Sequence, residues 1–265
     1  MNGKIPCTVE ILTRNNEHTI GRCLESVKDF AEILILDGNS TDRTLEIAKT
    51  YHCRIVRQYD MADENIPITD YAEVRNKGLR LSSYDWFMYI DSDEYLSREA
   101  AEEIRSIVEN SNPSVWVWWQ PRKYILNGKI IDCATTYPNQ QVRFFHKKYV
   151  MRFIKPIHER IVVKKGALVG ILRSPEFVPL GAIEELSDRW RRYTEKEFLM
   201  YASASRIRCF RAATRQFLLF WFYLVRYMRN FVLCRGTRMP FLYEWKRHRE
   251  ELRLAWFLFQ KFILP

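Results

Sequence analysis

Two aspartates stand two residues apart where an apolar run of the sequence ends. Asp91 and Asp93 follow residues 86–90, a run whose composition is typical of a buried strand. Carboxylate oxygens are the ligands that Mg²⁺ and Mn²⁺ prefer, and these ions often share them with substrate phosphates. The same spacing also occurs on solvated loops, and either aspartate could simply cap the following turn. The pair is the candidate metal site, and its meaning depends on the elements that precede it.

Three apolar runs, each followed by polar residues, alternate with helical patterns in the first third of the chain. The runs are residues 7–12, 32–36 and 86–90, and the helical patterns cover 18–28, 41–50 and 70–81. Strand–helix alternation predicts a largely parallel α/β sheet. Ligands of such sheets bind beyond the carboxyl ends of the strands. We therefore expect Asp37, Asp91 and Asp93 to face one crevice.

Five segments in this order resemble a family 2 glycosyltransferase of the GT-A fold. They are residues 11–17, 23–27, 35–48, 75–76 (Arg75-Asn76) and 90–94. The third segment begins Ile35-Leu-Asp-Gly-Asn-Ser-Thr-Asp42. More narrowly, the chain is similar to the bacterial branch that builds lipopolysaccharide or lipooligosaccharide cores, which includes a β-1,4-glucosyltransferase. Residues 137–145 and His158-Glu159 also fit that branch, whereas its longer Gly-rich tail motif is absent. The implied fold is a GT-A sheet with helices on both faces, followed by C-terminal amphipathic helices.

The resemblance implies how the donor is held. Asp91 and Asp93 would anchor Mn²⁺ or Mg²⁺ against the diphosphate of a nucleotide sugar, with Asp93 close to the reaction and Asp91 also near the nucleotide. Asp37 matches an aspartate that contacts the nucleoside, although it could instead bond to its own turn. The other implied nucleotide contacts are Thr13, Glu17, the weaker Asn15, and Arg75. Glu17 could instead only stabilise the N-terminal end of the following helix through the helix dipole. Arg75 could be a solvated surface group.

The acceptor side needs a base that takes a proton from the attacking hydroxyl. Glu159 is the first choice from the resemblance, and Glu94 is the alternative. His158 is a further candidate metal ligand, although a single histidine is more often a structural hydrogen-bonding group. Gln141 and Arg143 are candidates for holding the diphosphate or the acceptor, and they could equally be ordinary strand residues.

The middle of the chain yields further expected elements. Ser97 should begin a helix over 98–110, and the expected strands are 115–119, a hairpin over 124–131 with an Asn-Gly turn, 141–147 and 158–163. The tryptophans at 116, 118 and 119 could stack on sugar rings, but strand alternation makes at least one of them a core residue, and a structural role is favoured for each. Asp42 is expected to support a helix start and not the site.

Length and cysteine content set the broad class. The 265 residues suffice for one α/β domain with an appendage. The six cysteines have no Cys-x-x-Cys spacing, which favours reduced thiols in a cytosolic protein over a disulfide framework. The first residues show no signal-peptide core. The sequence therefore predicts a cytoplasmic protein.

Charge divides the chain into a proposed domain over 1–186 and a tail over 187–265. The first part has a net charge of −1 and the tail +11, and the tail holds 19 of the 38 aromatic residues. Basic and aromatic residues together favour a peripheral position on an anionic membrane. The longest apolar run, 217–225, has nine residues, whereas a spanning helix needs about 20. The alternatives are a sheet cover, an oligomer interface or, least favoured, a nucleic-acid site.

The combined prediction is an inverting, metal-dependent glycosyltransferase that moves a sugar from a nucleotide sugar to a lipid-linked saccharide. A UDP-sugar is the expected donor, because the family resemblance implies it. A polyprenyl-phosphate glycosyltransferase is the nearest rival, because it would share the donor half and need no base. A non-catalytic membrane adaptor would not retain the acidic site residues. A nucleotidyltransferase would normally carry a Gly-rich loop, and residues 13–17 contain no glycine.

Overall fold

The computed structural model describes residues 3–59 and 67–264. The chain forms two compact units, which are described separately. Unit 1 comprises residues 1–123 and 138–178, and unit 2 comprises 124–137 and 179–265. The sequence prediction drew a single boundary after residue 186, and it did not assign the 124–137 segment to the tail.

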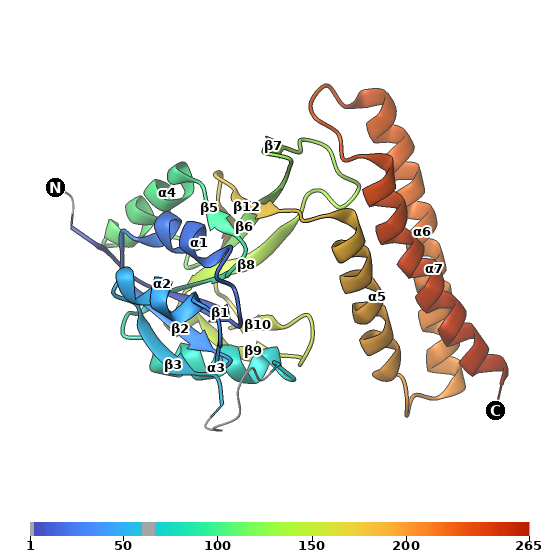
Figure 1. The fold of residues 1–265 in the computed structure, drawn as a ribbon, viewed down its shortest axis with the longest axis horizontal. Coiled ribbons are helices and arrows are strands. Elements are labelled where there is room, and N and C mark those ends of the chain that lie inside the picture. The colour runs from blue at the N-terminus through green and yellow to red at the C-terminus, as the bar shows by residue number, and fades with distance from the viewer. Residues whose placement is uncertain (1–2, 60–66, 265) are drawn as a thin grey trace. The chain divides into compact units, whose positions relative to one another are not determined.

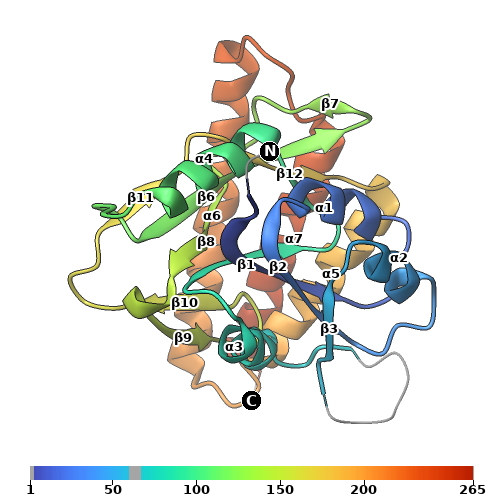
Figure 2. The ribbon, with the colours of Figure 1, turned by 90° about the vertical axis from the view of Figure 1, so that its left-hand side faces the viewer.

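The centre of unit 1 is a mixed sheet whose first half is parallel (Figures 1 and 2). Its parallel strands are β1 (Ile5–Thr13), β2 (Phe30–Asp37), β3 (Arg54–Arg57) and β4 (Trp86–Asp91), in the order β3-β2-β1-β4. β8 (Gln140–His146) pairs antiparallel with β4, and β6 (Val117–Leu126) pairs antiparallel with the other edge of β8. The shorter strands are β5 (Tyr95–Leu96), β11 (Val169–Ile171) and β12 (Glu176–Pro179), whereas β7 (Lys129–Ile130) lies in the 124–137 segment of unit 2. After the 3₁₀ turn η1 (Lys147–Tyr149), β9 (Val150–Ile154) pairs with β10 (Arg160–Val163) as a separate hairpin.

Helices cover both faces of the parallel half, as the sequence predicts for an α/β fold. One core cluster joins Val9 and Ile11 to α1 (Ile20–Val27), α2 (Thr44–Thr50) and α4 (Arg98–Glu109). A second cluster joins Leu12 to α3 (Tyr71–Leu81). Neighbouring β1 residues enter different clusters because successive side chains of a strand point to opposite faces.

Local side-chain bonds fix several element ends. Asp70 caps α3, and Ser97 caps α4 by accepting from the backbone N–H of Ala100, as expected. The expected Asn-Gly turn after β6 has positive φ at both Asn127 and Gly128. The helix expected from residue 41 begins only at Thr44.

Unit 2 consists mainly of three helices. They are α5 (Ile183–Leu199), α6 (Arg206–Leu233) and α7 (Phe241–Ile263). A short segment that contains Gly236 and Pro240 separates α6 from α7. These two helices share a small core that contains Cys209, Leu254 and Leu258. Within the described residues, no helix combines the length and apolar composition that a membrane-spanning segment requires.

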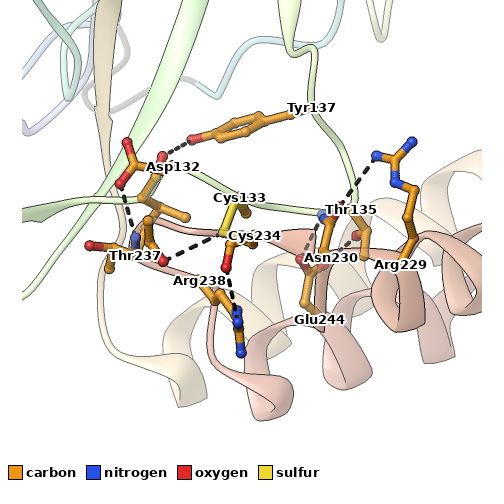
Figure 3. The surroundings of a disulfide bond; sticks show 12 residues. Asp132, Cys133, Thr135, Tyr137, Arg229, Asn230, Cys234, Thr237, Arg238 and Glu244 are labelled. Atoms are coloured by element: carbon orange, nitrogen blue, oxygen red, sulfur yellow. Dashed lines mark hydrogen bonds between the residues drawn. A yellow bond between two sulfur atoms is a disulfide. The ribbon is translucent and has the colours of Figure 1, made fainter. Parts of the chain in front are cut away.

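A disulfide between Cys133 and Cys234 ties the segment before Tyr137 to the α6–α7 turn (Figure 3). The expectation that all six cysteines are reduced is therefore wrong for this pair. The remaining four, at positions 7, 23, 53 and 209, are free thiols. The pair was missed because its members are 101 residues apart and meet only through the tertiary fold, with their Cα atoms 6.3 Å apart.

Candidate active site

The acidic residues expected at the site stand at the carboxyl edge of the parallel strands. Thr13 and Asp37 are register partners at the ends of β1 and β2, and Leu12 pairs with Asp91 at the end of β4. The three strand ends therefore bring Thr13, Asp37 and Asp91 to one edge. This is the edge at which open α/β sheets bind ligands.

A hydrogen-bonded group surrounds Asp37. Thr13 Oγ1 donates to Asp37 Oδ1 at 2.9 Å, and Ser40 donates through its backbone N–H to Oδ2 at 2.8 Å and through its hydroxyl to Oδ1 at 2.6 Å. Gln58 Nε2 donates to the backbone oxygens of Thr13 and Leu36. Asp37 is thus buried and held rigidly by its own loop and its neighbouring strand.

Asn15 and Glu17 connect the loops that follow β1 and β2. Asn15 has a positive φ of 52°, and its Oδ1 accepts from the backbone N–H of Thr41 at 2.8 Å. Glu17 Oε2 accepts from the backbone N–H of Arg43 at 3.1 Å, while Asp42 accepts from the N–H of Glu17 and of Thr44. The last bond supports the start of α2, as expected for Asp42. Both predicted nucleotide contacts therefore also brace the loops of the site.

Two buried arginines bind Asp91, and each donates a hydrogen bond to one of its carboxylate oxygens. Arg75 Nη2 donates to Oδ1 and Arg143 Nη2 donates to Oδ2, each at 2.8 Å. Arg75 also donates to Glu10 at 2.8 Å, and its guanidinium lies 4.5 Å from the ring centre of Tyr89. The arginine side chains are 1% and 2% exposed, whereas that of Asp91 is 39% exposed. The arginines therefore act as buried supports that hold a partly exposed carboxylate.

Further buried acids complete this group around Arg143. Its Nη1 lies 3.2 Å from both Glu94 Oε2 and Glu176 Oε1. Arg122 pairs with Glu94 and lies 3.6 Å from Glu176. Three guanidinium groups thus compensate a larger set of carboxylates inside unit 1.

The environment separates the protonation behaviour of these acids. Burial acts to raise the pKa of Asp91, but the charges of Arg143, Arg75 and Arg122 outweigh it and hold this pKa well below its usual range. Burial raises the pKa of Glu10 to about 7 in spite of Arg75. Burial and the neighbouring Glu94 raise the pKa of Glu176 well above the ordinary value. Asp91 is therefore ionised near neutral pH, whereas Glu176 favours its protonated form.

Glu10, Arg122 and Glu176 were missed as members of the site. A usable signal existed for Glu10, because an acid inside the apolar strand 7–12 must have a buried partner. Gly78 belongs to the same arrangement, since a Cβ there would lie 1.8 Å from Glu10 Oε1. No comparable pattern marks Arg122 or Glu176, whose neighbours in the sequence are ordinary strand residues.

The two candidate bases occupy different environments. Glu94 is 4% exposed and is engaged by two arginines. Glu159 is 17% exposed, and its Oε1 lies 3.6 Å from Arg75 Nε. Glu159 directly precedes β10, whose partner β9 is fixed by two bonds between the amide of Asn76 and the backbone of Phe153. The Arg75-Asn76 pair therefore supports both Asp91 and the hairpin that carries Glu159.

The remaining predicted residues are Gln141, Asp93 and His158. Gln141 accepts from Arg143 Nε at 3.1 Å, so these two are brought together. Asp93 is half-buried, and His158 is exposed with a positive φ of 55°. Among residues 3–59 and 67–264, no three or more His, Cys, Asp or Glu side chains are arranged to hold a metal ion. The structure therefore does not assemble Asp91, Asp93 and His158 into a metal site made by protein alone.

A metal that shares its ligands with the substrate still fits the site. Mg²⁺-type sites commonly use one or two carboxylates, with the remaining ligands from phosphates and water. Asp91 keeps its ionised carboxylate partly exposed, and Asp93 lies two residues further on. The donor set thus suits a metal carried with a diphosphate.

The first half of the chain is similar to a known protein family. Residues 8–132 match the model "Glycosyl transferase family 2", slightly under half of the chain. The matched segment covers most of β1, all of β2, β3 and β4, and the residues Asp37, Arg75, Asp91 and Asp93. This agrees with the resemblance seen in the sequence, while the lipopolysaccharide-core branch is not separately supported.

Several curated relatives are named as glycosyltransferases of bacteria or of a bacteriophage. An uncharacterized glycosyltransferase of Rickettsia typhi is 29% identical over 52% of this chain and 46% of its own length. A further one from Rickettsia felis is 24% identical over 83% of this chain and 78% of its own. The glycosyltransferase SunS of Bacillus phage SPbeta is 33% identical over 38% of this chain and 23% of its own. The chain spans about half the length of the relatives that head this comparison.

Two solved structures illustrate the structural similarity. S. aureus TarS 1-349 in complex with UDP-GlcNAc has a TM-score of 0.49 and 15% identity, covering 94% of this chain and 90% of that one. Mycobacterium tuberculosis glucosyl-3-phosphoglycerate synthase, in complex with Mn²⁺, UDP and glucosyl-3-phosphoglycerate, has a TM-score of 0.34 and 22% identity, covering 46% and 44%.

Proposed function

We propose that this chain is an inverting, metal-assisted glycosyltransferase that moves a sugar from a nucleoside diphosphate donor to a lipid-linked saccharide at a membrane surface. The main support is that Arg75 and Arg143 hydrogen-bond to Asp91 at the carboxyl edge of the sheet. Thr13 and Asp37 lie at the same edge. This arrangement lies largely within the matched family 2 segment. UDP is the expected nucleotide from the family resemblance.

The proposed donor contacts follow from the two loops at this edge. Asp37 and Thr13 would meet the nucleoside, with Asn15 and Glu17 shaping the loop around it. Arg75 and Arg143 are too deeply buried to face bulk solvent, so their proposed role is to position Asp91. A buried guanidinium that holds a carboxylate by a charge-assisted bond fixes both its orientation and its ionised state.

Asp91 and Asp93 would hold Mn²⁺ or Mg²⁺ together with the donor phosphates. When bound, the ion supplies electrostatic stabilisation of the charge that builds on the departing diphosphate. The contribution of the chain is to keep Asp91 ionised and correctly oriented before the donor arrives. His158 is not required for this role.

Glu159 is the proposed base toward the acceptor hydroxyl. It is more exposed than Glu94, whose carboxylate is occupied by Arg122 and Arg143. The hairpin of β9 and β10 gives Glu159 a fixed support, and its carboxylate would accept the hydroxyl proton as the sugar bond forms.

A thermal-shift screen of nucleotide sugars, with and without Mn²⁺, tests the donor half. A ligand that binds only the folded protein raises the melting temperature by mass action. We expect a UDP-sugar to give a shift that Mn²⁺ increases, and Asp93→Asn to lose the Mn²⁺-dependent part. Asp29→Asn, at an exposed position before β2, is the matched control and should respond like the wild type. No shift with any nucleotide sugar would refute the proposed donor class.

A turnover measurement of Glu159→Gln tests the acceptor half. The variant should keep the donor shift and lose about 10²–10⁴-fold in turnover, because it cannot accept the proton. Glu73→Gln on the exposed side of α3 should retain wild-type turnover. Full turnover in Glu159→Gln, together with its loss in Asp93→Asn, would contradict this base and favour an acceptor that arrives ionised, such as a polyprenyl phosphate.

A further inference from the structure

The outward side of α6 is apolar, although it faces solvent. The residues concerned, called here the apolar face, are Phe217, Leu218, Trp221, Phe222, Val225, Met228 and Val232, each between 48% and 74% exposed. The buried side of the same helix carries Cys209, Ala213, Gln216 and Phe220. An ordinary amphipathic helix places polar residues opposite its buried side. Here both sides are largely apolar, which indicates that the outward side has a partner of its own.

The first turns of α7 extend this face. Phe241, Leu242 and Trp245 are between 41% and 54% exposed. The ring of Phe241 lies 5.4 Å from that of Tyr227, and Trp245 lies 6.2 Å from Phe220. The exposed apolar residues of the two helices therefore lie at the same end of the hairpin, within unit 2.

Arginines border the apolar face on one flank. Arg208, Arg211, Arg215, Arg226 and Arg229 are spaced by three, four, eleven and three residues. These spacings return to one side of an α-helix. The guanidinium of Arg226 lies 5.3 Å from the ring centre of Phe222, so this half-buried arginine packs along the apolar surface.

Acidic residues are absent from this part of the sequence. Residues 198–243 contain eight arginines and no Asp or Glu. A two-fold contact between copies would place the same patch against itself, and this patch offers no acidic residue to pair with the arginines. The aliphatic residues Leu218, Val225 and Val232 offer no stacking surface for nucleic-acid bases. An anionic lipid surface satisfies both features, because its headgroups neutralise the arginines while its acyl region accepts the apolar side chains.

We propose that the apolar face, with its arginine flank, docks on the surface of a bilayer that contains anionic phospholipids. This inference rests on the proposed function and specifies its membrane partner. The docking itself does not depend on sugar transfer. The α6 helix would lie along the interface with Leu218, Val225 and Val232 directed into the lipid. The arginines would contact headgroup phosphates at the flank.

Flotation with vesicles tests this docking. The full chain should bind vesicles of phosphatidylglycerol and phosphatidylcholine more tightly than vesicles of phosphatidylcholine alone. The triple variant Leu218→Ser, Val225→Ser, Val232→Ser should bind the anionic vesicles at least tenfold more weakly. The double variant Arg211→Gln, Arg229→Gln should bind the anionic vesicles roughly 25-fold more weakly, because each arginine near an anionic surface contributes about fivefold. Its vesicle binding should also depend less on salt concentration.

A matched triple variant controls for loss of exposed apolar area in general. Met151, Leu168 and Ile171 of unit 1 are 63%, 62% and 55% exposed, and changing all three to Ser should leave vesicle binding unchanged. The donor-induced thermal shift should persist in every variant. Flotation therefore reports on membrane docking, and the thermal shift reports on donor binding. Unchanged vesicle binding by the α6 triple variant would overturn the proposal. A wild-type dimer in vesicle-free solution that this variant converts to a monomer, with vesicle binding intact, would also overturn it and assign the face to self-association.

Discussion

The carboxylates around the candidate site outnumber the guanidinium groups that compensate them. The acids are Glu10, Asp91, Glu94, Glu159 and Glu176, and the arginines are Arg75, Arg122 and Arg143. Buried ionised acids are costly unless each has a partner, so such a group gains stability when some members hold a proton. The raised pKa values of Glu10 and Glu176 and the lowered pKa of Asp91 follow from this balance. The arginines thus hold the pKa of Asp91 low, whereas burial raises the pKa of Glu10 and of Glu176.

The stability of the protein should depend on pH through Glu10. Its pKa rises from an ordinary 4.5 to about 7 on folding. Between these values the folded state binds more protons than the unfolded state, so the free energy of unfolding falls as pH rises. The Glu10 contribution is about 3 kcal/mol across this window. Urea unfolding at about pH 5 and about pH 8 should show a smaller fall for Glu10→Gln than for the wild type.

Glu99→Gln provides the comparison for this measurement. Glu99 lies exposed in the first turn of α4, and its replacement should leave the pH dependence of unfolding at the wild-type value. A pH dependence of Glu10→Gln equal to that of the wild type would show that Glu10 is ionised throughout and would contradict the proton sharing.

At the scale of elements, the cap of α4 should contribute measurably to stability. Ser97 Oγ accepts from the backbone N–H of Ala100 at 3.1 Å in a buried position. Ser97→Ala removes this acceptor and should lower the free energy of unfolding by about 1 kcal/mol, measured by urea denaturation. Ser106 lies on the same helix and donates to the backbone oxygen of Glu102. Ser106→Ala should be nearly neutral, because that bond does not satisfy an unpaired N–H. Equal losses in both variants would show that the cap has no special role.

Local patterns explain why most elements of unit 1 were predicted correctly. The strands at 7–12, 32–36 and 86–90 are mostly apolar, and the caps at Asp70 and Ser97 depend on residues only three positions away. The long strand β6 was divided into two pieces, because Pro121 and its polar neighbours interrupt the apolar pattern. In the fold, Arg122 in this interval is buried against Glu94 and Glu176, a pairing between distant segments that no local pattern reveals.

At the scale of the whole molecule, contacts between distant segments account for the remaining differences from the sequence prediction. The strand order brought Asp37 and Asp91 to one edge as predicted, because parallel topology fixes that edge. The segment 124–137 joins unit 2 through contacts that the sequence does not mark. Thr135 donates to Glu244 of α7 through its backbone N–H at 2.7 Å, and its hydroxyl lies 2.6 Å from His248 Nε2. The Cys133–Cys234 disulfide secures the same segment to the α6–α7 turn, as Figure 3 shows.

This disulfide should stabilise unit 2 mainly by restricting its unfolded chain. It joins residues 101 positions apart, so the unfolded chain loses much freedom when the bond is present. The double variant Cys133→Ser, Cys234→Ser should lower the free energy of unfolding by about 2–5 kcal/mol, and dithiothreitol should lower the wild-type value similarly. Cys53→Ser, at a free and half-buried thiol, should still respond to dithiothreitol as the wild type does. If reductant left wild-type unfolding unchanged while mass spectrometry showed the bond broken, the loop closed by Cys133 and Cys234 would already be held by Thr135, Glu244 and the adjoining backbone bonds.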